Sequence, residues 1–257
     1  KVSESARGAS QLNLLEFLQS KSALTVAVAS AVRRVQMNHN ELEAIARAMV
    51  ARGHGILAAD ESSGTIKKRF DAIKLESTEE ARRSYRELLF TAPGLAEHIG
   101  GVILFDETLR QRTRDGVPFA EVLARQGIVP GIKVDKGATP LPGFPGDTIT
   151  EGLDGLRGRL TEYHQLGARF AKWRAVIDIG AGFPSRFAIA ANAHALARYA
   201  ALCQEANIVP IVEPEVLMDG DHTIERCEEV TEWTLREQFA ALASQRVAFE
   251  RMVLKPS

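Results

Sequence analysis

Ionisable residues lie at or near the ends of several apolar segments of this chain, and their types suggest covalent chemistry. These residues are Asp60, Lys133, Asp135, Lys172, Arg174, Glu213, Glu215 and Lys255. A surface charge at a strand end would explain any one of them, but several segments repeat the placement. Burial of so many charges is tolerable only when they pair with each other or with a charged ligand. The pattern therefore predicts a shared site for a small, anionic, phosphorylated substrate.

A lysine in such a site can act as a nucleophile. Crowding by other cations lowers the pKa of a lysine, and a neutral amine attacks a carbonyl carbon to form a Schiff base. Neighbouring carboxylates can move the protons that forming and hydrolysing the imine require. Metal catalysis is the main alternative, but the histidines show neither an HExxH pair nor a cluster at strand ends. The predicted chemistry needs no cofactor and no metal.

The segments that must position these residues alternate between strands and helices. Apolar, β-branched runs predict strands at 55–60, 100–105, 129–135, 169–177, 207–216 and 251–257. Helical periodicity predicts helices at 38–53, 77–89, 152–166, 186–206 and 221–243. In a strand, residues two apart share a face, so Lys172 and Arg174 point the same way, as do Glu213 and Glu215.

Six such alternations indicate an α/β protein with a parallel sheet covered by helices. A doubly wound sheet and a (β/α)8 barrel both fit this order. The glycine-rich phosphate fingerprint of dinucleotide-binding folds is missing after the first strand. The charges at the strand ends favour the barrel, because barrels place their chemistry at the C-terminal mouth. We therefore expect one domain over residues 38–257.

Local signals predict several helix ends and faces. The first helix should bury Leu42, Ile45, Ala46, Met49 and Val50. The second should begin with a capping box between Ser77 and Glu80 and pack through Tyr85, Leu88 and Leu89. The charge run 79–83 in that helix predicts a solvated face. Ser185 and Asp221 are expected N-caps of later helices.

Three side chains are expected to pack rather than react. Trp173 lies between two inward-facing residues, so it should point outward into the helix layer. Cys203 and Cys227 fall within helical patterns and should be thiols on helix faces in the core.

Composition narrows the partners and the compartment. The net charge is -1, from 32 basic and 33 acidic residues without a basic block. Neither nucleic acid nor a membrane surface is an expected partner. The two cysteines show no metal or redox spacing, which favours a reducing, cytoplasmic location. Residues 1–37 are expected to be an N-terminal extension, either flexible or an extra helix, with a targeting remnant as the alternative.

The chain closely resembles the class I fructose-bisphosphate aldolases over residues 41–257. The resemblance rests on the collinear segments GILAADESSGTIKKRF, GVILFDETL, GIKVDKG, EGLDGL, FAKWR, VPIVEPEVLMDGDH and LKP. It implies a metal-free (β/α)8 barrel lyase, a homotetramer. It also implies reversible cleavage of fructose 1,6-bisphosphate to dihydroxyacetone phosphate and glyceraldehyde 3-phosphate in glycolysis and gluconeogenesis.

The resemblance also assigns catalytic roles by motif position. Lys255 in LKP would be the Schiff-base lysine. Glu213 in VEPE would be the general acid/base for carbinolamine dehydration, with Glu215 hydrogen-bonded nearby. Asp60 in AADES would orient the amine and handle the C4 hydroxyl. Lys172 in FAKWR would contact the substrate, and the residue types by themselves suggest that Lys172 and Arg174 help to keep Lys255 neutral.

Further residues would bind the substrate. Arg174 in FAKWR is implied as a substrate contact. Lys133, Ser62, Thr65 and Arg69 would hold the C6 phosphate. The SSGT turn suits a phosphate independently of the resemblance, because hydroxyls and backbone N–H groups converge at the start of a helix.

Aldolases of this class run on for further strand–helix units beyond the LKP motif. About six of eight units are therefore expected here, as a partial barrel truncated after the sixth strand. Two hypotheses follow: an aldolase, or a truncated, catalytically inactive aldolase-like chain that serves as an oligomerisation or binding module. A transaldolase or a deoxyribose-phosphate aldolase is disfavoured, because ADES, FAKWR and VEPE are specific motifs.

Overall fold

A computed structural model describes residues 40–256 of the chain. The chain divides into two units, Lys1–Glu41 and Leu42–Ser257, and the fold described below is that of the second. The expected N-terminal extension at 1–37 lies outside the described residues.

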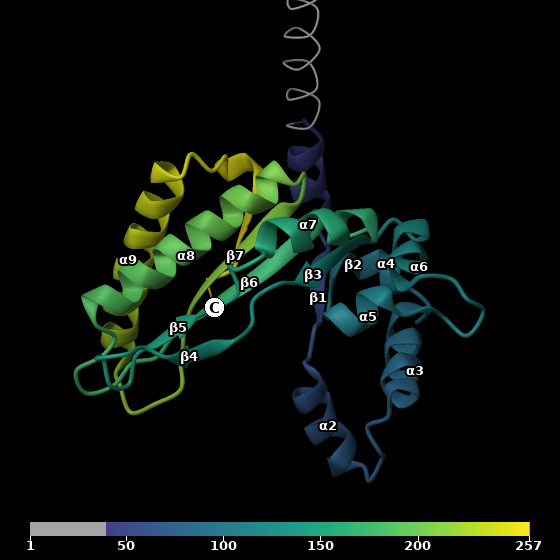
Figure 1. Cartoon of the computed structure of the whole chain (residues 1–257), viewed down its shortest axis with the longest axis horizontal. Coiled ribbons are helices and arrows are strands. Elements are labelled where there is room, and N and C mark those ends of the chain that lie inside the picture. The colour runs from purple at the N-terminus through teal and green to yellow at the C-terminus, as the bar shows by residue number, and fades with distance from the viewer. Residues whose placement is uncertain (1–39, 257) are drawn as a thin grey trace, which may run out of the picture. The chain divides into compact units, whose positions relative to one another are not determined.

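Six parallel strands form the main sheet, in the order in which they occur along the chain (Figure 1). They are β1 (Gly55–Ala59), β2 (Ile99–Leu104), β3 (Val129–Lys133), β6 (Phe170–Ile177), β7 (Val209–Val216) and β8 (Val253–Leu254). All six predicted strands are confirmed. Sequential, parallel neighbours of this kind form part of a (β/α)8 barrel, which confirms the expected fold class.

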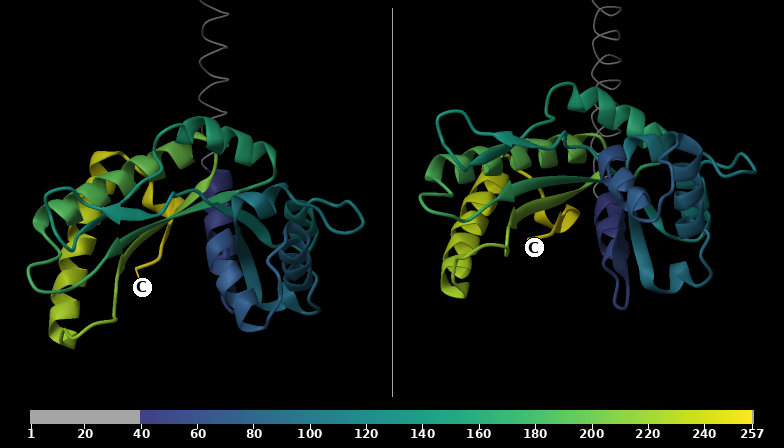
Figure 2. Two further views of the ribbon diagram at one scale, coloured as in Figure 1. Left: turned by 60° about the horizontal axis from the view of Figure 1, so that its bottom comes forward. Right: turned by 90° about the horizontal axis from the view of Figure 1, so that it is seen from below.

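Helices connect these strands and cover one face of the sheet (Figure 2). They are α2 (Ser63–Ala72), α3 (Glu79–Phe90), α4 (Leu95–His98), α5 (Asp106–Arg110), α6 (Phe119–Arg125), α7 (Leu156–Gln165), α8 (Arg186–Glu205), α9 (Ile224–Ser244) and the short 3-10 helix η1 (Phe249–Arg251). The longest, α8 and α9, pack against each other and on β7. Within residues 40–256, no helix has the length and apolar character needed to cross a bilayer.

Some helix ends differ from the sequence predictions. Ser185 caps α8 as predicted, accepting a hydrogen bond from the Ala188 N–H at 3.1 Å. The expected caps Ser77 and Asp221 are wrong, because Thr78 caps α3 and Thr223 caps α9. In each case a hydroxyl nearer the helix sits where it can accept from the first free N–H groups.

Two helix faces also differ from the prediction. Residues 40–49 are helical and bury Leu42 and Met49, but Val50 follows the last turn and is 54% exposed. On α3, Leu88 is 71% exposed, whereas Arg86 is only 3% exposed. Tyr85 and Leu89 pack as predicted, against Phe70 and the main core, so only Leu88 was wrong, and the charged Arg86 takes a buried place on the helix.

The outer face of the sheet packs against the helices in the largest apolar core. Trp173 is fully buried there, and the centroid of its ring lies 5.5 Å from that of Tyr199 on α8. Its predicted outward direction is therefore confirmed. Cys203 lies in the same core, where burial raises the pKa of its thiol. Cys227 packs on α9 against a smaller cluster that contains Val230. Both cysteines therefore lie on helix faces, as expected.

The inner face of the sheet carries two layers. Near the N-terminal ends of the strands, an apolar cluster joins Phe170, Val209 and Ile211 to the first helix, and Val129 and Val253 pack against it. Two or four residues further along the same strands, on the same face, come the charged residues of the predicted site. The sheet thus stacks an apolar floor beneath a charged layer at its C-terminal edge.

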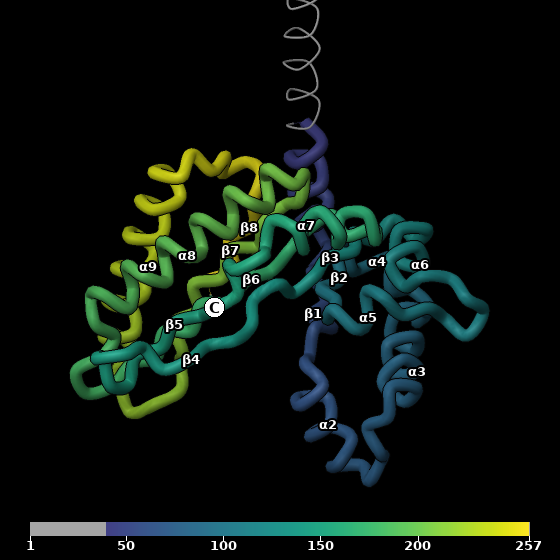
Figure 3. Tube along the Cα trace, in the orientation of Figure 1, coloured from purple at the N-terminus to yellow at the C-terminus, as the bar shows by residue number. Residues whose placement is uncertain are grey.

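A hairpin that the sequence analysis missed follows β3. Strands β4 (Ala138–Pro140) and β5 (Thr148–Thr150) pair antiparallel, and β5 lies beside β6 (Figure 3). Thr148 Oγ1 donates to the Val176 carbonyl at 3.0 Å, and buried Asn192 of α8 bonds both Thr148 and Thr150. Three-residue strands are too short to show an alternating pattern in the sequence.

The close packing of the apolar floor predicts that one methyl group added at Gly131 destabilises the fold. A Cβ at Gly131 would lie 2.2 Å from Phe170 Cζ, and Phe170 is fully buried. Gly131→Ala should therefore lower the free energy of unfolding by about 1–3 kcal/mol through overpacking. Gly158→Ala is the matched control: a Cβ there meets nothing within 4 Å in α7, so the variant should gain roughly 0.5 kcal/mol. Urea denaturation would measure both, and equal effects would contradict the close packing.

Candidate active site

Four predicted residues form one connected chain of charges on the inner face of the sheet. Lys172 Nζ lies 3.5 Å from Asp60 Oδ2 and 2.9 Å from Glu213 Oε2. The other carboxylate oxygen of Glu213 accepts a hydrogen bond from Lys255 Nζ. Residues from β6 and β7 and from the ends of β1 and β8 therefore meet around one buried carboxylate.

Strand alternation explains why these side chains meet. Lys172 lies two residues after Phe170, Glu213 two after Ile211, and Lys255 two after Val253, and all three apolar residues face the inner cluster. The Lys255 N–H also donates to the Val212 carbonyl at 2.9 Å, which extends the pairing of β7 and β8. The parallel register therefore delivers both lysines to the same glutamate.

Burial sets the electrostatics of this charge chain. The side chains of Lys172, Asp60 and Glu213 are 10%, 13% and 3% exposed, whereas Lys255 is 44% exposed. Burial by itself would lower the pKa of Lys172, but the charges of Asp60 and Glu213 outweigh it and raise the pKa above its ordinary value. Lys172 is thus held as a cation between two carboxylates, and Lys255 is the lysine accessible to a ligand.

The remaining charges of β3, β6 and β7 form local pairs. Arg174 bonds Glu215, the residue predicted to be hydrogen-bonded near the catalytic glutamate. Lys133 Nζ lies 3.4 Å from Asp135 Oδ1, an oxygen that also accepts the Gly137 N–H at 3.1 Å. Asp135 is missing from the predicted site residues, although it was among the charges at strand ends.

The predicted phosphate turn forms at the start of α2. Ser62 is the N-cap, and its hydroxyl lies 3.1 Å from Thr65 Oγ1. The Thr65 N–H points to Ser62 Oγ at 3.4 Å, a long contact that a phosphate oxygen could replace. Hydroxyls and N–H groups at a helix start suit an anion.

Glu61, between Asp60 and Ser62, is a site residue that the sequence analysis missed. Its carboxylate pairs with Arg69 through one oxygen and with Arg86 of α3 through the other, the latter at 2.6 Å. The position of Glu61 inside the AADES segment could have drawn attention to it. Nothing in the periodicity of α3 could have identified Arg86 as its partner.

A cleft of about 270 Å³ opens beside these groups. Six of the ten predicted site residues line it: Asp60, Ser62, Thr65, Lys133, Lys172 and Arg174. Glu61 and the start of the hairpin at Ala138 complete its wall. Glu213 and Lys255 join the cleft through Lys172, whereas Arg69 reaches it through Glu61.

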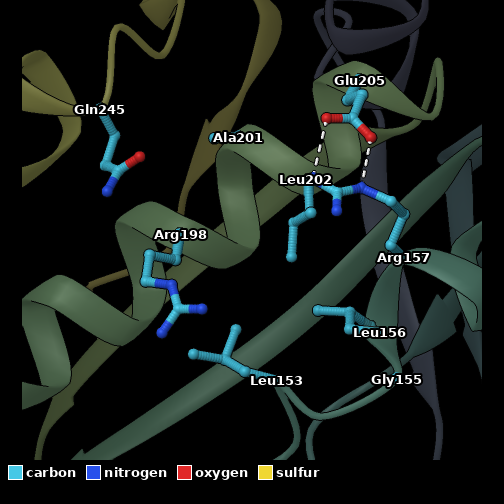
Figure 4. A pocket seen from close by; sticks show the side chains of 9 residues that line it. All are labelled: Leu153, Gly155, Leu156, Arg157, Arg198, Ala201, Leu202, Glu205 and Gln245. Atoms are coloured by element: carbon cyan, nitrogen blue, oxygen red, sulfur yellow. Dashed lines mark hydrogen bonds and ion pairs between the residues drawn. The ribbon is translucent and has the colours of Figure 1, made fainter.

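A larger hollow of about 540 Å³ lies between α7, α8 and the end of α9 (Figure 4). Arg157 and Glu205 form an ion pair across it at 2.6 Å, which neutralises both charges. Among the described residues that line this hollow, none is a predicted site residue. Within residues 40–256, no group of three His, Cys, Asp or Glu side chains could hold a metal ion.

The arrangement is suited to carbonyl chemistry on an anionic substrate. Lys255 supplies an accessible amine, Glu213 a carboxylate within bonding distance of that amine, and Asp60 a second carboxylate on the far side of Lys172. Such a group of one nucleophile and two proton carriers matches the needs of imine formation and C–C cleavage.

The Glu61 pair predicts a pH dependence of stability. Burial raises the pKa of Glu61, but hydrogen bonds and the charges of Arg86 and Arg69 outweigh it, so the pKa lies below the ordinary value of 4.5. A depressed folded-state pKa gives stability that is complete above the unfolded pKa and is lost as pH falls through the folded one. The difference in unfolding free energy between the wild type and Glu61→Gln should therefore shrink between about pH 6 and pH 3. Urea denaturation at each pH would measure it.

Glu76→Gln is the control for this pH series, because Glu76 is exposed and lies on the loop before α3. Its difference from the wild type should stay constant across the same pH range. A Glu61→Gln difference that also stays constant would contradict the ion-paired state of Glu61.

Comparison with known proteins identifies relatives of this chain. The family model described as fructose-bisphosphate aldolase class-I matches residues 41–257. A probable class 1 fructose-bisphosphate aldolase from Xanthomonas campestris is 64% identical over 221 residues, which are 86% of this chain and 66% of the relative. A cytosolic fructose-bisphosphate aldolase 5 from Arabidopsis thaliana is 54% identical over 218 residues, 85% of this chain and 61% of the relative.

A solved structure supports the same relationship. The fructose-bisphosphate aldolase from Plasmodium falciparum, crystallised in complex with TRAP and a small-molecule inhibitor, superposes with a TM-score of 0.83 at 51% identity. The match covers 85% of this chain and 64% of that one. The chain spans about two thirds of the length of the relatives it matches. With the family model covering most of the sequence and a relative at this identity, the chain belongs to the class I fructose-bisphosphate aldolase family.

Proposed function

We propose that the chain cleaves fructose 1,6-bisphosphate reversibly to dihydroxyacetone phosphate and glyceraldehyde 3-phosphate through a Schiff base on Lys255. The observation that carries the proposal is the buried Glu213 carboxylate, which forms an ion pair with Lys255 through one oxygen and with Lys172 through the other. A carboxylate placed against an accessible amine is the pair that imine formation needs.

In the proposed first steps, the Lys255 amine attacks the C2 carbonyl carbon of the open-chain sugar. The attack needs the neutral amine, so Glu213 first takes a proton from the Lys255 ammonium. The C=O π electrons then move to oxygen, which takes up the proton that the attacking nitrogen loses, and this gives a carbinolamine. Glu213 then delivers a proton to the carbinolamine hydroxyl, the C2–O bond breaks and water leaves. The product is a protonated imine, which is an electron sink at C2.

In the proposed cleavage, Asp60 accepts the proton of the C4 hydroxyl. The electrons of that O–H bond form the aldehyde C=O, and the C3–C4 bond breaks toward the iminium to give an enamine. Glyceraldehyde 3-phosphate leaves as the aldehyde. Protonation at C3 and hydrolysis of the imine then release dihydroxyacetone phosphate and the free lysine, so that atoms and charges balance.

The positions of the cations support an orientation for the substrate. The Ser62–Thr65 turn and Lys133 line the same cleft as Asp60 and Lys172. We assign the C6 phosphate to the turn, Lys133 and Arg69, and the sugar hydroxyls to Lys172 and Arg174. Binding energy at the phosphate then positions C4 against Asp60.

The proposed partners and location rest on the family. We propose a sugar phosphate substrate and a homotetramer, as the resemblance implies. A cytoplasmic location is proposed because a similar plant aldolase is described as cytosolic. The catalytically inactive binding module remains the competing hypothesis, and the experiment below separates the two.

Covalent trapping tests the reaction directly. Sodium borohydride added with dihydroxyacetone phosphate should reduce the imine and leave a stable adduct on Lys255, detected by peptide mass spectrometry. Lys255→Met should abolish the adduct, because it removes the amine. Lys67→Met is the matched control, since Lys67 is exposed and paired with Asp71 on α2. A folded wild-type chain that self-associates but forms no adduct would favour the inactive module.

Lys133 tests the orientation of the substrate. Lys133→Ala removes a cation from the cleft, so KM for fructose 1,6-bisphosphate should rise about tenfold or more. KM for fructose 1-phosphate, which lacks the C6 phosphate, should change little. Steady-state kinetics with both sugars would measure the difference. An equal rise in KM for both sugars would contradict the assignment of Lys133 to the C6 phosphate.

A further inference from the structure

Arg86 is a buried cation whose partner lies in the cleft. Its side chain is 3% exposed, on α3. Arg86 Nη1 donates to Glu61 Oε2 at 2.6 Å, and Nη2 donates to the Glu61 backbone carbonyl at 3.3 Å. One planar guanidinium therefore holds both the side chain and the main chain of the residue that separates Asp60 from Ser62.

The charges around Glu61 do not cancel. Two guanidinium groups, those of Arg69 and Arg86, share one carboxylate, which leaves one positive charge in the group. Arg86 cannot release Glu61 without leaving an unpaired buried charge. Arg69 is 57% exposed and can turn toward a ligand at little cost. The surplus positive charge is therefore available at Arg69.

Glu61 would be harmful to phosphate binding without this arrangement. Its carboxylate lines the same cleft as Ser62, Thr65 and Lys133. An unneutralised carboxylate there would repel a phosphate and would also keep Arg69 as its own partner. Burial raises the pKa of Glu61, but the Arg86 hydrogen bond, a backbone hydrogen bond and the two arginine charges outweigh it and lower the pKa, which is in keeping with a carboxylate that stays ionised and paired.

We infer that Arg86 is a positioning residue for the phosphate end of the site. By holding and neutralising Glu61, it leaves the charge of Arg69 free for a phosphoryl group at the Ser62–Thr65 turn. It also fixes the main chain that aims Asp60 at Lys172. This inference deepens the proposed function and rests on it for the identity of the substrate, whereas the binding of phosphate can be measured without any reaction.

The first test is the binding of inorganic phosphate, measured by isothermal titration calorimetry on the full chain. Arg86→Met should weaken phosphate binding about tenfold, because Glu61 then neutralises Arg69. Glu61→Gln should strengthen it severalfold, since the amide can still accept from Arg86 and no longer neutralises a guanidinium. The double variant Glu61→Gln, Arg86→Met should return to within about threefold of the wild type.

Arg82→Met is the matched control on the same helix. The Arg82 guanidinium donates two hydrogen bonds to Glu107, from Nε to Oε1 at 2.8 Å and from Nη2 to Oε2 at 2.7 Å. The loss of Arg82 therefore also removes a half-buried ion pair of α3. Its phosphate affinity should equal that of the wild type. Circular dichroism and thermal melting of each variant separate lost binding from lost folding, and Glu61→Gln remains decisive if Arg86→Met does not fold.

The second test uses the proposed substrates. Arg86→Met should raise KM for fructose 1,6-bisphosphate more than KM for fructose 1-phosphate, and should lower kcat for both through Asp60. Unchanged phosphate affinity in Arg86→Met or Glu61→Gln, or no recovery in the double variant, would overturn the inference. A wild type without a Lys255 adduct would instead overturn the proposed function, while the phosphate measurements would still decide the role of Arg86.

Discussion

The shared carboxylate of Glu213 is the interaction on which the site depends. It is 3% exposed and forms an ion pair with a lysine on each side, one from β6 and one from the end of β8. A charge buried to this degree is strongly destabilising when it loses a partner, so neither lysine can move far without disturbing the sheet. Because Lys172 also reaches Asp60, the same group ties together the outermost strands β1 and β8 of the sheet. The proposed nucleophile is therefore held in place by the charges that would serve it.

This charged layer needs the apolar floor beneath it. The inner cluster around Phe170, Val209 and Ile211 fills the N-terminal half of the sheet interior. Phe170 fits because Gly131 on the adjacent strand β3 and Gly101 on the next strand, β2, leave room for its ring. The floor fixes the strand register, and the register places each charge two or four residues further toward the C-terminal edge. Packing and chemistry thus occupy successive layers of the same strand faces.

The contact between Arg86 and Glu61 shows how helix α3 supports the site although Arg86 does not line the cleft. The β1–α2 turn carries Asp60 and Ser62, which we propose for proton transfer and for phosphate binding, yet α3 holds the residue between them through Arg86. The expected solvated charges of α3 were wrong for Arg82 and Arg83, which are only 17% and 16% exposed and pair with Glu107 and with Glu80 and Glu87. Arg82 thereby ties α3 to α5, whereas the ion pairs of Arg83 lie within α3.

The sequence by itself determined the six strands and their parallel order. It also pointed to the proposed site residues: nine of the ten lie in or beside one connected cleft, and the tenth, Arg69, reaches it through Glu61. Residues two apart on a strand must share a face, and local apolar runs reveal the strands. Tertiary structure alone decided the hairpin β4–β5, the exposure of Leu88 and the partnership of Arg86 with Glu61. Arg86 and Glu61 are 25 residues apart. Such a contact leaves no periodic trace, because it depends on how α3 packs against the end of β1 and not on either segment alone.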